Sequence, residues 1–333
     1  MKQGNRTILY QNLPLKIPYL LQIFPCYACN FKCQYCLHAL PASDHGFISN
    51  QKFMDMDVFQ RVVDDLADRG QRVKMLRFAG IGEPLLHPQI AEMVSYAVQR
   101  DVAGQVDIVT NASLLTPELS DRLLAAGLST LRVSIEGLST EEYERNACVH
   151  VDFTKLVNNI RYYFERCGSS KVYVKIIDYM LKGDPEQEQR FYDLFRPISH
   201  TTAIEHLTPT VENIDYQSFS GDVNFSQTQD GECVHPINIC PQAFYMIQCN
   251  PDGSFVPCCS TQYPIVVQRK EQTVQAVWNG QELTSFRCGL LKGTKAEACK
   301  GCTLYQYGAY PEDILDGHEE ELLARYNAIC YGR

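Results

Sequence analysis

Strand-like segments alternate with helical segments between residues 19 and 207, and this alternation constrains the fold more than any other feature. Each strand-like segment is short and apolar, whereas the segments between carry apolar residues at helical spacing. Strands are expected at residues 19–24, 73–79, 106–109, 131–135, 171–179 and 201–207, and helices at 55–69, 88–100, 117–126 and 185–195, with further helical stretches up to about residue 167. Such alternation is typical of parallel β/α units. Six units predict an α/β fold, a partial (β/α)6 barrel, with ligands at the carboxyl ends of the strands.

A cysteine-rich loop directly follows the first predicted strand. It reads F-P-C-Y-A-C-N-F-K-C-Q-Y-C-L-H, and Cys29, Cys33 and Cys36 in it have C-x3-C-x2-C spacing. Soft thiolates select iron–sulfur clusters or zinc. Structural zinc sites use four ligands, usually with C-x2-C pairs, so an odd third cysteine indicates a cubane cluster with one iron free of protein ligands. A zinc loop, or buried cysteines without a metal, is the alternative.

This loop resembles the cluster loop of the radical S-adenosylmethionine (SAM) enzymes, in which the open iron binds the amino and carboxylate groups of SAM. Residues 80–84 read G-I-G-E-P and resemble the G-G-E-P motif that holds the SAM amino group. Residues 133–137 read V-S-I-E-G and resemble the segment that reaches the SAM ribose and carboxylate, with Glu136 in place of the more usual aspartate. The resemblance covers residues 19–207. It implies a SAM-binding set of Tyr35, Gly80, Gly82, Glu83, Pro84, Asn111, Ser134 and Glu136.

A second group of cysteines lies between residues 236 and 309. Cys240, Gly253 and Cys258 follow C-x12-G-x4-C spacing, and Cys299 and Cys302 add a C-x2-C pair. The intervening N-P-D-G predicts the turn of a β-hairpin. A zinc ribbon has similar spacing. After a radical SAM barrel, the pattern resembles the SPASM/twitch extension, which implies one auxiliary [4Fe-4S] cluster held by these four cysteines. The T-L-Y-Q-Y-G-A-Y after Cys302 lacks the further cysteines of the full SPASM pattern.

The chain contains 15 cysteines, so several are left over. Cys249 precedes the hairpin turn, and strand alternation predicts that it lies on the face opposite Cys258. We expect a free thiol near the active-site mouth that can donate a hydrogen atom to a substrate radical; a packed strand cysteine is the alternative. Cys259 can compete with Cys258 as a ligand. The remaining cysteines are expected to be small buried residues: Cys26, Cys148, Cys167, Cys233, Cys288 and Cys330.

Composition limits the partners and the compartment. The formal net charge is −9 and no Lys/Arg run reaches five residues, which counts against nucleic acid as a partner. No apolar run is long enough to span a membrane, and the N-terminus lacks the features of a signal peptide. We therefore expect a cytoplasmic protein. The predicted parts are an N-terminal extension at 1–18, the barrel at 19–207, a linker or lid at 208–235, the auxiliary-cluster domain at 236–309 and a C-terminal helix at 310–333.

The resemblance implies that a 5′-deoxyadenosyl radical removes hydrogen from a substrate C–H bond, with a flavodoxin or ferredoxin-type protein as reductant. Only 28 residues precede Cys29, too few for a peptide-recognition domain, which favours a small sugar-like or aminocyclitol substrate over peptide maturation. Epimerisation with Cys249 as donor is expected first. The alternative is dehydrogenation of a secondary alcohol through the auxiliary cluster, with Lys175 or His206 as base. A non-catalytic iron–sulfur or zinc protein would leave G-I-G-E-P and S-I-E-G unexplained.

Overall fold

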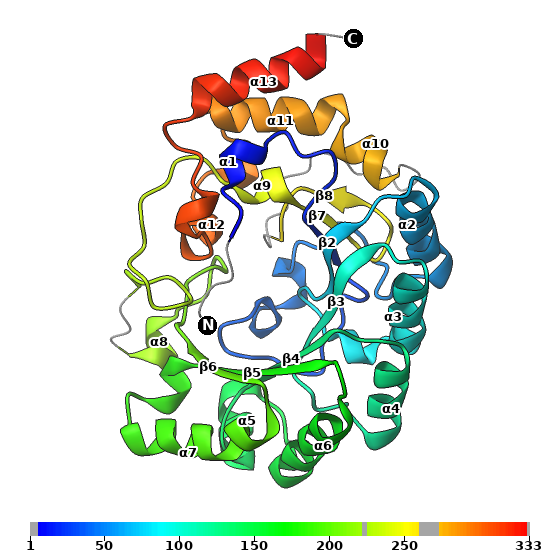
Figure 1. The fold of residues 1–333 in the computed structure, drawn as a ribbon. Helices are drawn as coiled ribbons and strands as arrows, with labels where there is room; N and C mark the ends of the chain where they lie inside the picture. Colours follow the sequence, from blue (N-terminus) through cyan, green and yellow to red (C-terminus); the bar gives the residue numbers. More distant parts are fainter. Residues whose placement is uncertain (1–5, 222–224, 260–272, 332–333) are drawn as a thin grey trace.

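The computed structural model describes residues 6–221, 225–259 and 273–331. Its eight strands form one sheet in the order β6-β5-β4-β3-β2-β1-β7-β8 (Figure 1). β1 to β6 are all parallel to their neighbours, so the predicted six-unit α/β barrel is confirmed as an open, curved sheet. The strands are β1 Leu20–Ile23, β2 Val73–Phe78, β3 Ala103–Thr110, β4 Thr130–Ile135, β5 Lys171–Ile177, β6 Thr201–Glu205, β7 Met246–Cys249 and β8 Phe255–Val256.

Helices cover the outer side of the curved sheet (Figure 1). The barrel helices are α2 Met56–Asp68, α3 Ile90–Gln99, α4 Pro117–Ala125, α5 Thr140–Ala147, α6 Phe153–Arg166 and α7 Pro185–Phe195. Several begin at a side chain that accepts a backbone hydrogen bond: Thr116 caps α4, Ser139 caps α5 and Asp152 caps α6. The other helices are α1 Leu9–Asn12, α8 Gln217–Ser220, α9 Gln242–Tyr245, α10 Val274–Trp278, α11 Gln281–Leu291, α12 Leu304–Tyr307 and α13 Glu319–Tyr331.

The two faces of the sheet differ in polarity. Residues in register across parallel strands point to the same side. Ile23, Phe78 and Ile108 are in register and completely buried beneath the helices. One residue earlier on each strand, Gln22, Arg77 and Asp107 are in register on the inner face. The outer face therefore holds the apolar core, and the inner face carries polar and charged side chains.

The predicted β-hairpin is confirmed, but it is not separate from the barrel. β7 and β8 are antiparallel with Cys249 opposite Phe255, and the Asn250 amide donates to the Ser254 carbonyl at 2.9 Å. Gly253 has a φ of +83°, which glycine adopts without strain. β7 also pairs in parallel with β1, so the cysteine-rich segment extends the barrel sheet.

The N-terminal segment that carries α1 packs against the C-terminal helices (Figure 1). Trp278 Nε1 donates to the Leu15 carbonyl at 2.9 Å, and Arg325 Nη1 donates to the Tyr10 carbonyl at 2.8 Å. The C-terminal helix begins later than the predicted residue 310: a 3-10 turn at Pro311–Asp313 precedes α13, which starts at Glu319.

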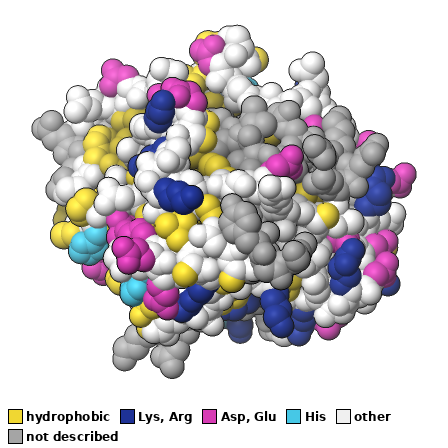
Figure 2. All heavy atoms as spheres, turned by 90° about the horizontal axis from the view of Figure 1, so that it is seen from above, with side chains coloured by type: hydrophobic (Ala, Val, Ile, Leu, Met, Phe, Trp, Pro, Cys, Tyr) yellow, Lys and Arg dark blue, Asp and Glu magenta, His cyan; other side chains and the backbone are white. Residues whose placement is uncertain are grey.

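The surface mixes both signs of charge. Lys and Arg side chains lie scattered among Asp and Glu side chains on the face seen in Figure 2. Among the described residues, no helix is long and apolar enough to cross a membrane.

Candidate active site

The cysteine loop leaves the end of β1 and is anchored to the C-terminal end of α5. The amides of Lys32 and Gln34 donate to the carbonyls of Ala147 and Asn146, both at 2.9 Å. Cys29, Cys33 and Cys36 lie within this loop, and the pKa of Cys33 is raised by burial and by the charges of Glu136, Cys36 and Cys29. The structure therefore places the three predicted ligands in one anchored loop at the carboxyl end of β1.

The G-I-G-E-P loop after β2 packs directly against the cysteine loop. The Glu83 amide donates to the Ala28 carbonyl at 2.8 Å, and the Cys26 thiol donates to the Glu83 carbonyl at 3.1 Å. A Cβ at Gly82 would lie 2.2 Å from the Cys26 carbonyl oxygen, and one at Gly80 would lie 2.2 Å from the Phe24 ring. Gly82 is required because the backbone of the cysteine loop approaches too closely for any side chain, and Gly80 is favoured by the Phe24 ring against it and by its φ of +138°.

We expect Gly82→Ala to displace the G-I-G-E-P loop from the cysteine loop, because backbone atoms cannot move aside as a flexible side chain can. SAM affinity should fall by more than about tenfold, the size of effect that supporting changes have at metal sites. Gly70→Ala is the control, since nothing lies within 4 Å of its new Cβ and its φ of +61° adds only local strain. Equilibrium binding of SAM to both reconstituted variants measures the difference; equal affinities would contradict the prediction.

Glu83 itself is buried and fixes the loop geometry. Its Oε1 accepts from the Leu85 amide at 2.9 Å and the Thr110 hydroxyl at 2.6 Å, and its Oε2 accepts from the Asn111 amide at 2.8 Å. Burial raises the pKa of Glu83 to about 6. Both carboxylate oxygens accept hydrogen bonds from the chain, so Glu83 positions the ends of β2 and β3.

Two further predicted residues complete this scaffold. Asn111 Nδ2 donates to Asn30 Oδ1 at 3.0 Å, which ties the end of β3 to the cysteine loop. Pro84 is buried at the start of the 3-10 turn that follows Glu83. Direct contacts of these side chains with SAM stay a prediction.

Glu136, at the end of β4, reaches the cysteine loop. Its Oε1 accepts from the Tyr35 hydroxyl at 2.8 Å, whereas its Oε2 is buried with no hydrogen-bond partner among the described residues. Burial raises the pKa of Glu136, and Lys175 and Cys33 lie near enough to affect it. Ser134 lies on the inner face of β4, in register with Lys175. An unsatisfied buried oxygen beside the thiols fits a bound polar ligand, and these residues therefore fit a cluster with SAM.

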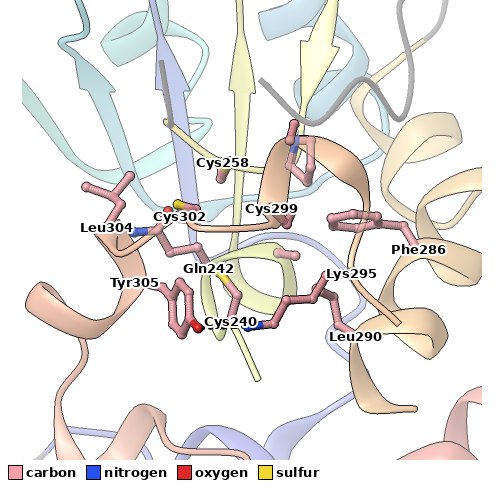
Figure 3. A pocket seen from close by; sticks show the side chains of 13 residues that line it. Cys240, Gln242, Cys258, Phe286, Leu290, Lys295, Cys299, Cys302, Leu304 and Tyr305 are labelled. Atoms are coloured by element: carbon pink, nitrogen blue, oxygen red, sulfur yellow. Dashed lines mark hydrogen bonds between the residues drawn. The ribbon is translucent and has the colours of Figure 1, made fainter. Parts of the chain in front are cut away.

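The second group of cysteines surrounds one pocket. Cys240, Cys258, Cys299 and Cys302 all line it, although they come from three separate segments (Figure 3). Its walls are otherwise mainly apolar, and Lys295 donates to the Tyr305 hydroxyl at 3.0 Å at one side. Burial raises the pKa of Cys240 to about 12, with contributions from Cys302 and Cys299. Four thiols around an apolar pocket fit the ligand set of a fully coordinated iron–sulfur cluster.

Cys249 does not lie near the active-site mouth, and that prediction is wrong. It is completely buried and in register with Ile23, so it points to the outer, helix-covered face of the sheet. Burial raises the pKa of its thiol, and its Sγ contacts the Asn250 carbonyl at 3.7 Å. The pairing of β7 with β1 turns the Cys249 side chain away from the barrel interior.

Most of the other cysteines also differ from expectation. Cys148 and Cys233 are exposed rather than buried, while Cys26 is buried as predicted. The side chain of Cys330 lies outside the described residues. Cys259 contacts Gln242 Oε1 at 3.9 Å, and its pKa, raised to about 11 by burial, is also influenced by Cys302 and Arg77.

The two candidate bases occupy different surroundings. Lys175 Nζ is ion-paired with Glu205 Oε2, and Glu205 also accepts from the Tyr173 hydroxyl at 2.9 Å. His206 Nδ1 lies 2.5 Å from Asp178 Oδ2. A carboxylate on one ring nitrogen orients the imidazole and leaves the other nitrogen for proton transfer.

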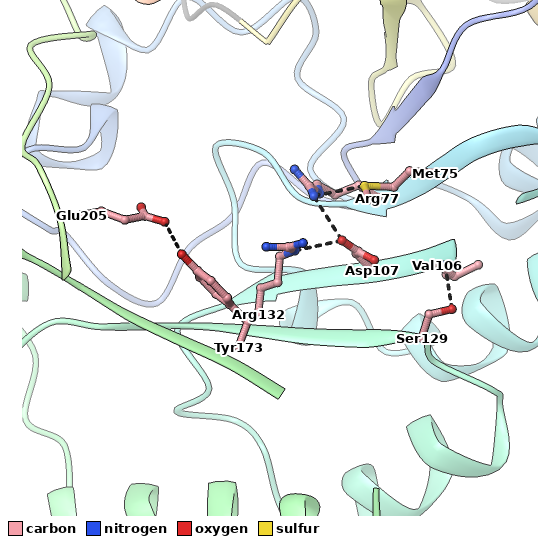
Figure 4. Close-up of polar contacts among 8 residues, drawn as sticks. All are labelled: Met75, Arg77, Val106, Asp107, Ser129, Arg132, Tyr173 and Glu205. Carbon is pink, nitrogen blue, oxygen red and sulfur yellow. Dashed lines mark hydrogen bonds and ion pairs between the residues drawn. The ribbon is translucent and has the colours of Figure 1, made fainter. Parts of the chain in front are cut away.

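Sequence reasoning missed a charged group on the inner face of β2 to β5. Arg77 Nη2 and Arg132 Nε both donate to Asp107 Oδ2, at 3.1 Å and 2.9 Å, and Tyr173 lies next to Arg132 (Figure 4). The signal in the sequence was a charged residue within each of three largely apolar strands: Arg77 in β2, Asp107 in β3 and Arg132 in β4. Such a residue faces the inside of the barrel because the apolar positions on either side of it face the helices.

Two family models match this chain. The model of the radical SAM superfamily matches residues 23–195, slightly more than half of the chain. The chain belongs to the radical SAM superfamily. The model of the SPASM iron–sulfur cluster-binding domain matches residues 240–303. Together these matches imply an enzyme whose cofactors are SAM and [4Fe-4S] clusters, including an auxiliary cluster.

The curated relatives share only part of their length with this radical SAM protein. A tungsten-containing aldehyde ferredoxin oxidoreductase cofactor-modifying protein from Pyrococcus furiosus is 33% identical over 114 residues, which is 34% of this chain and 30% of the relative. A GTP 3′,8-cyclase from Clostridium perfringens is 28% identical over 163 residues, 48% of this chain and 46% of the relative. Mycofactocin maturase MftC from Mycobacterium tuberculosis is 31% identical over 115 residues, 34% and 27%. The chain thus spans less than half the length of these relatives.

Solved structures agree in fold. SuiB from Streptococcus suis superposes with a TM-score of 0.61 at 14% identity, covering 91% of this chain and 78% of SuiB. anSMEcpe with bound AdoMet gives 0.59 at 14%, covering 94% and 99%. BtrN in complex with AdoMet and 2-DOIA gives 0.51 at 15%, covering 86% and 93%. At these identities the likeness concerns the fold alone.

Proposed function

We propose that this enzyme is a radical SAM dehydrogenase that oxidises a carbinol carbon of a small sugar-like or aminocyclitol molecule. The observation that carries the proposal is the pocket lined by Cys240, Cys258, Cys299 and Cys302. Four protein ligands leave no iron of the auxiliary cluster open to substrate, which suits a role in electron transfer. The case for epimerisation with Cys249 is lost, because that thiol faces the helices.

Cys29, Cys33 and Cys36 would hold the first cluster, and Gly82 and Glu83 would keep the loop beside it in place. When bound, SAM and the reduced first cluster would supply the chemistry that removes the carbinol hydrogen atom, and the auxiliary cluster held by the four cysteines would supply an electron acceptor. The hydroxyl proton passes to a base. We favour His206, whose ring is oriented by Asp178, over Lys175, which is ion-paired with Glu205.

A small polar substrate is supported by the cleft beside β6. This cleft has a volume of about 800 Å³, and its lining includes Asp230 and Glu232, whereas Glu205 and Glu312 in it are ion-paired with Lys175 and Arg6. Such a lining favours amino groups over anions at this side of the barrel. BtrN, which shares the fold, was solved with AdoMet and 2-DOIA, and SuiB with its precursor peptide SuiA, so peptide maturation is the competing substrate class. A flavodoxin or ferredoxin-type reductant belongs to the proposal.

Epimerisation is the second candidate, now with a different thiol. Cys259 directly follows Cys258 in the chain, and its Sγ lies 3.9 Å from Gln242 Oε1. If it is not a cluster ligand, its S–H bond can return a hydrogen atom to a substrate radical. The product would then be an epimer rather than an oxidised alcohol.

The test is an anaerobic reaction in D2O with aminoglycosides, nucleotide sugars and short peptides, followed by mass spectrometry. We expect a sugar-like product two mass units lighter than the substrate, at unchanged yield in Cys249→Ala. A product one unit heavier that is lost in Cys259→Ser, while 5′-deoxyadenosine still forms, would overturn dehydrogenation in favour of epimerisation. Turnover of peptides alone would overturn the substrate class.

A further inference from the structure

Two arginines on the inner face share one buried carboxylate. Arg77 lies on β2, Asp107 on β3 and Arg132 on β4, so the three side chains come from neighbouring strands. Both guanidinium groups donate to the same oxygen, Asp107 Oδ2. Asp107 is completely buried, whereas the side chains of Arg77 and Arg132 are 25% and 27% exposed. The group carries a net charge of +1 and presents it to the barrel interior (Figure 4).

Most of the donors in this group are unused. Among the described residues, Arg132 gives one hydrogen bond, through Nε. Its guanidinium carbon lies 5.1 Å from the centroid of the Tyr173 ring. Arg77 contacts Asp107 and Met75 Sδ through Nη2 only, and its Nε is buried without a partner among the described residues. Guanidinium groups present fixed forks of donors that match the oxygens of carboxylates and phosphates.

The position of the group connects it with the reaction. Arg132, Ser134 and Glu136 follow one another on the same face of β4. Arg132 is therefore further from the carboxyl end of the strand than Glu136, which contacts Tyr35 of the cysteine loop. Arg77 is in register with Gln22 of β1, which is in register with Gln248 of β7, so Arg77 lies on the side of the cysteine-rich hairpin. The nearest carboxylate on the β6 side, Glu205, is held by Tyr173 and Lys175. A ligand held by the arginines would thus lie between the two groups of cysteines.

We propose that Arg77 and Arg132 form an oxyanion subsite that binds a carboxylate or phosphate group of the substrate, with Asp107 as the residue that positions both. This deepens the proposed function, on which it rests for the reaction: it makes the substrate an anionic sugar-like molecule, with its anion towards β2–β4 and away from the acidic cleft beside β6. The charge-assisted hydrogen bonds hold the substrate in one orientation between the radical source and the electron acceptor.

The experiment measures binding, so that it does not depend on turnover. The reconstituted full chain with SAM is titrated with D-glucuronate, D-glucose 6-phosphate and the neutral control D-glucose. We expect at least one anionic sugar to bind tenfold or more tightly than glucose. The affinity for that sugar should fall about tenfold in Arg132→Gln and in Arg77→Gln, which is the effect of losing one charge-assisted hydrogen bond. Arg122→Gln, which removes an exposed arginine paired with Glu92 on the outer helices, should change nothing.

Two results would overturn the subsite. Equal affinity of the anionic sugars and glucose for the wild-type chain would show that no anion is recognised. A tenfold loss of SAM affinity in Arg132→Gln would instead assign the arginine to the SAM carboxylate. Arg132→Lys retains the charge without the fork, so partial recovery of anion binding separates this role from a purely structural one. Binding without oxidation in the D2O reaction would leave the subsite intact and refute only the dehydrogenase.

Discussion

Replacement of Cys33 by alanine is expected to abolish reductive cleavage of SAM. Cys33 lies in the middle of the C-x3-C-x2-C motif, and the thiols of Cys29 and Cys36 are its neighbours in the loop. Three thiolates hold a cluster whose fourth iron is open, so loss of one leaves too few ligands. Iron content should fall from about eight to about four atoms per chain, the content of one cluster. Formation of 5′-deoxyadenosine under dithionite should fall more than about 100-fold, since supporting residues of metal sites alone cost 10–100-fold.

The control is Cys167→Ser. Cys167 is a partly exposed cysteine at the C-terminal end of α6, on the outer side of the barrel. It should keep both the iron and the cleavage activity of the wild-type chain. If Cys33→Ala retained SAM cleavage, or if Cys167→Ser lost it, the assignment of Cys29, Cys33 and Cys36 as the cluster ligands would be wrong.

The barrel could be predicted from sequence because its strands are recognisable both by their apolar composition and by their alternation with helical segments. The first five apolar segments are each followed by a helical segment, and this alternation, with a sixth strand after it, specifies a parallel sheet. The ends of the strands were predicted less accurately. β3 starts at Ala103, three residues before the predicted start, because pairing with β2 extends it through Gly104 and Gln105. Here tertiary pairing overrides weak local strand preference.

The place of the hairpin could not be predicted. Its turn and its register followed from N-P-D-G and from alternation within two strands. Which way its faces point depends on β7 pairing with β1, two strands more than 200 residues apart in the chain. Cys249 was therefore assigned to the interior when Gln248, one residue earlier, is the side chain that shares the inner face with Gln22.

The inner arginines show a different limit. Arg77, Asp107 and Arg132 each looked like a polar residue in a strand, and only the register of β2, β3 and β4 reveals that they meet. Similarly, the three hydrogen bonds that make Glu83 a support for the ends of β2 and β3 could not be read from G-I-G-E-P. Motifs indicate which residues belong to the site. Whether such a residue contacts a ligand or supports its neighbours becomes clear only when the pairing of the strands is known.

Loss of the auxiliary cluster is expected to separate SAM cleavage from product formation. In Cys258→Ala the auxiliary pocket keeps three of its four cysteines, and iron content should fall to about four atoms per chain, the content of one cluster. The first cluster is held by Cys29, Cys33 and Cys36, so 5′-deoxyadenosine should still form. Oxidised product should fall about 100-fold, because the substrate radical has no electron acceptor, and a metal ligand supports at least as much activity as the residues around it.

The two variants therefore have opposite signatures, which makes the comparison informative. Cys33→Ala should lose deoxyadenosine and product together, whereas Cys258→Ala should retain deoxyadenosine and lose product. Cys258→Ser, which keeps an oxygen ligand, should fall between Cys258→Ala and the wild-type chain, and a melting curve shows whether the pocket folds without its cluster. If Cys258→Ala formed product at the wild-type rate with four irons fewer, the auxiliary cluster would not be the electron acceptor. The four cysteines would then serve the fold, and epimerisation, which returns a hydrogen atom without net oxidation, would explain the reaction better.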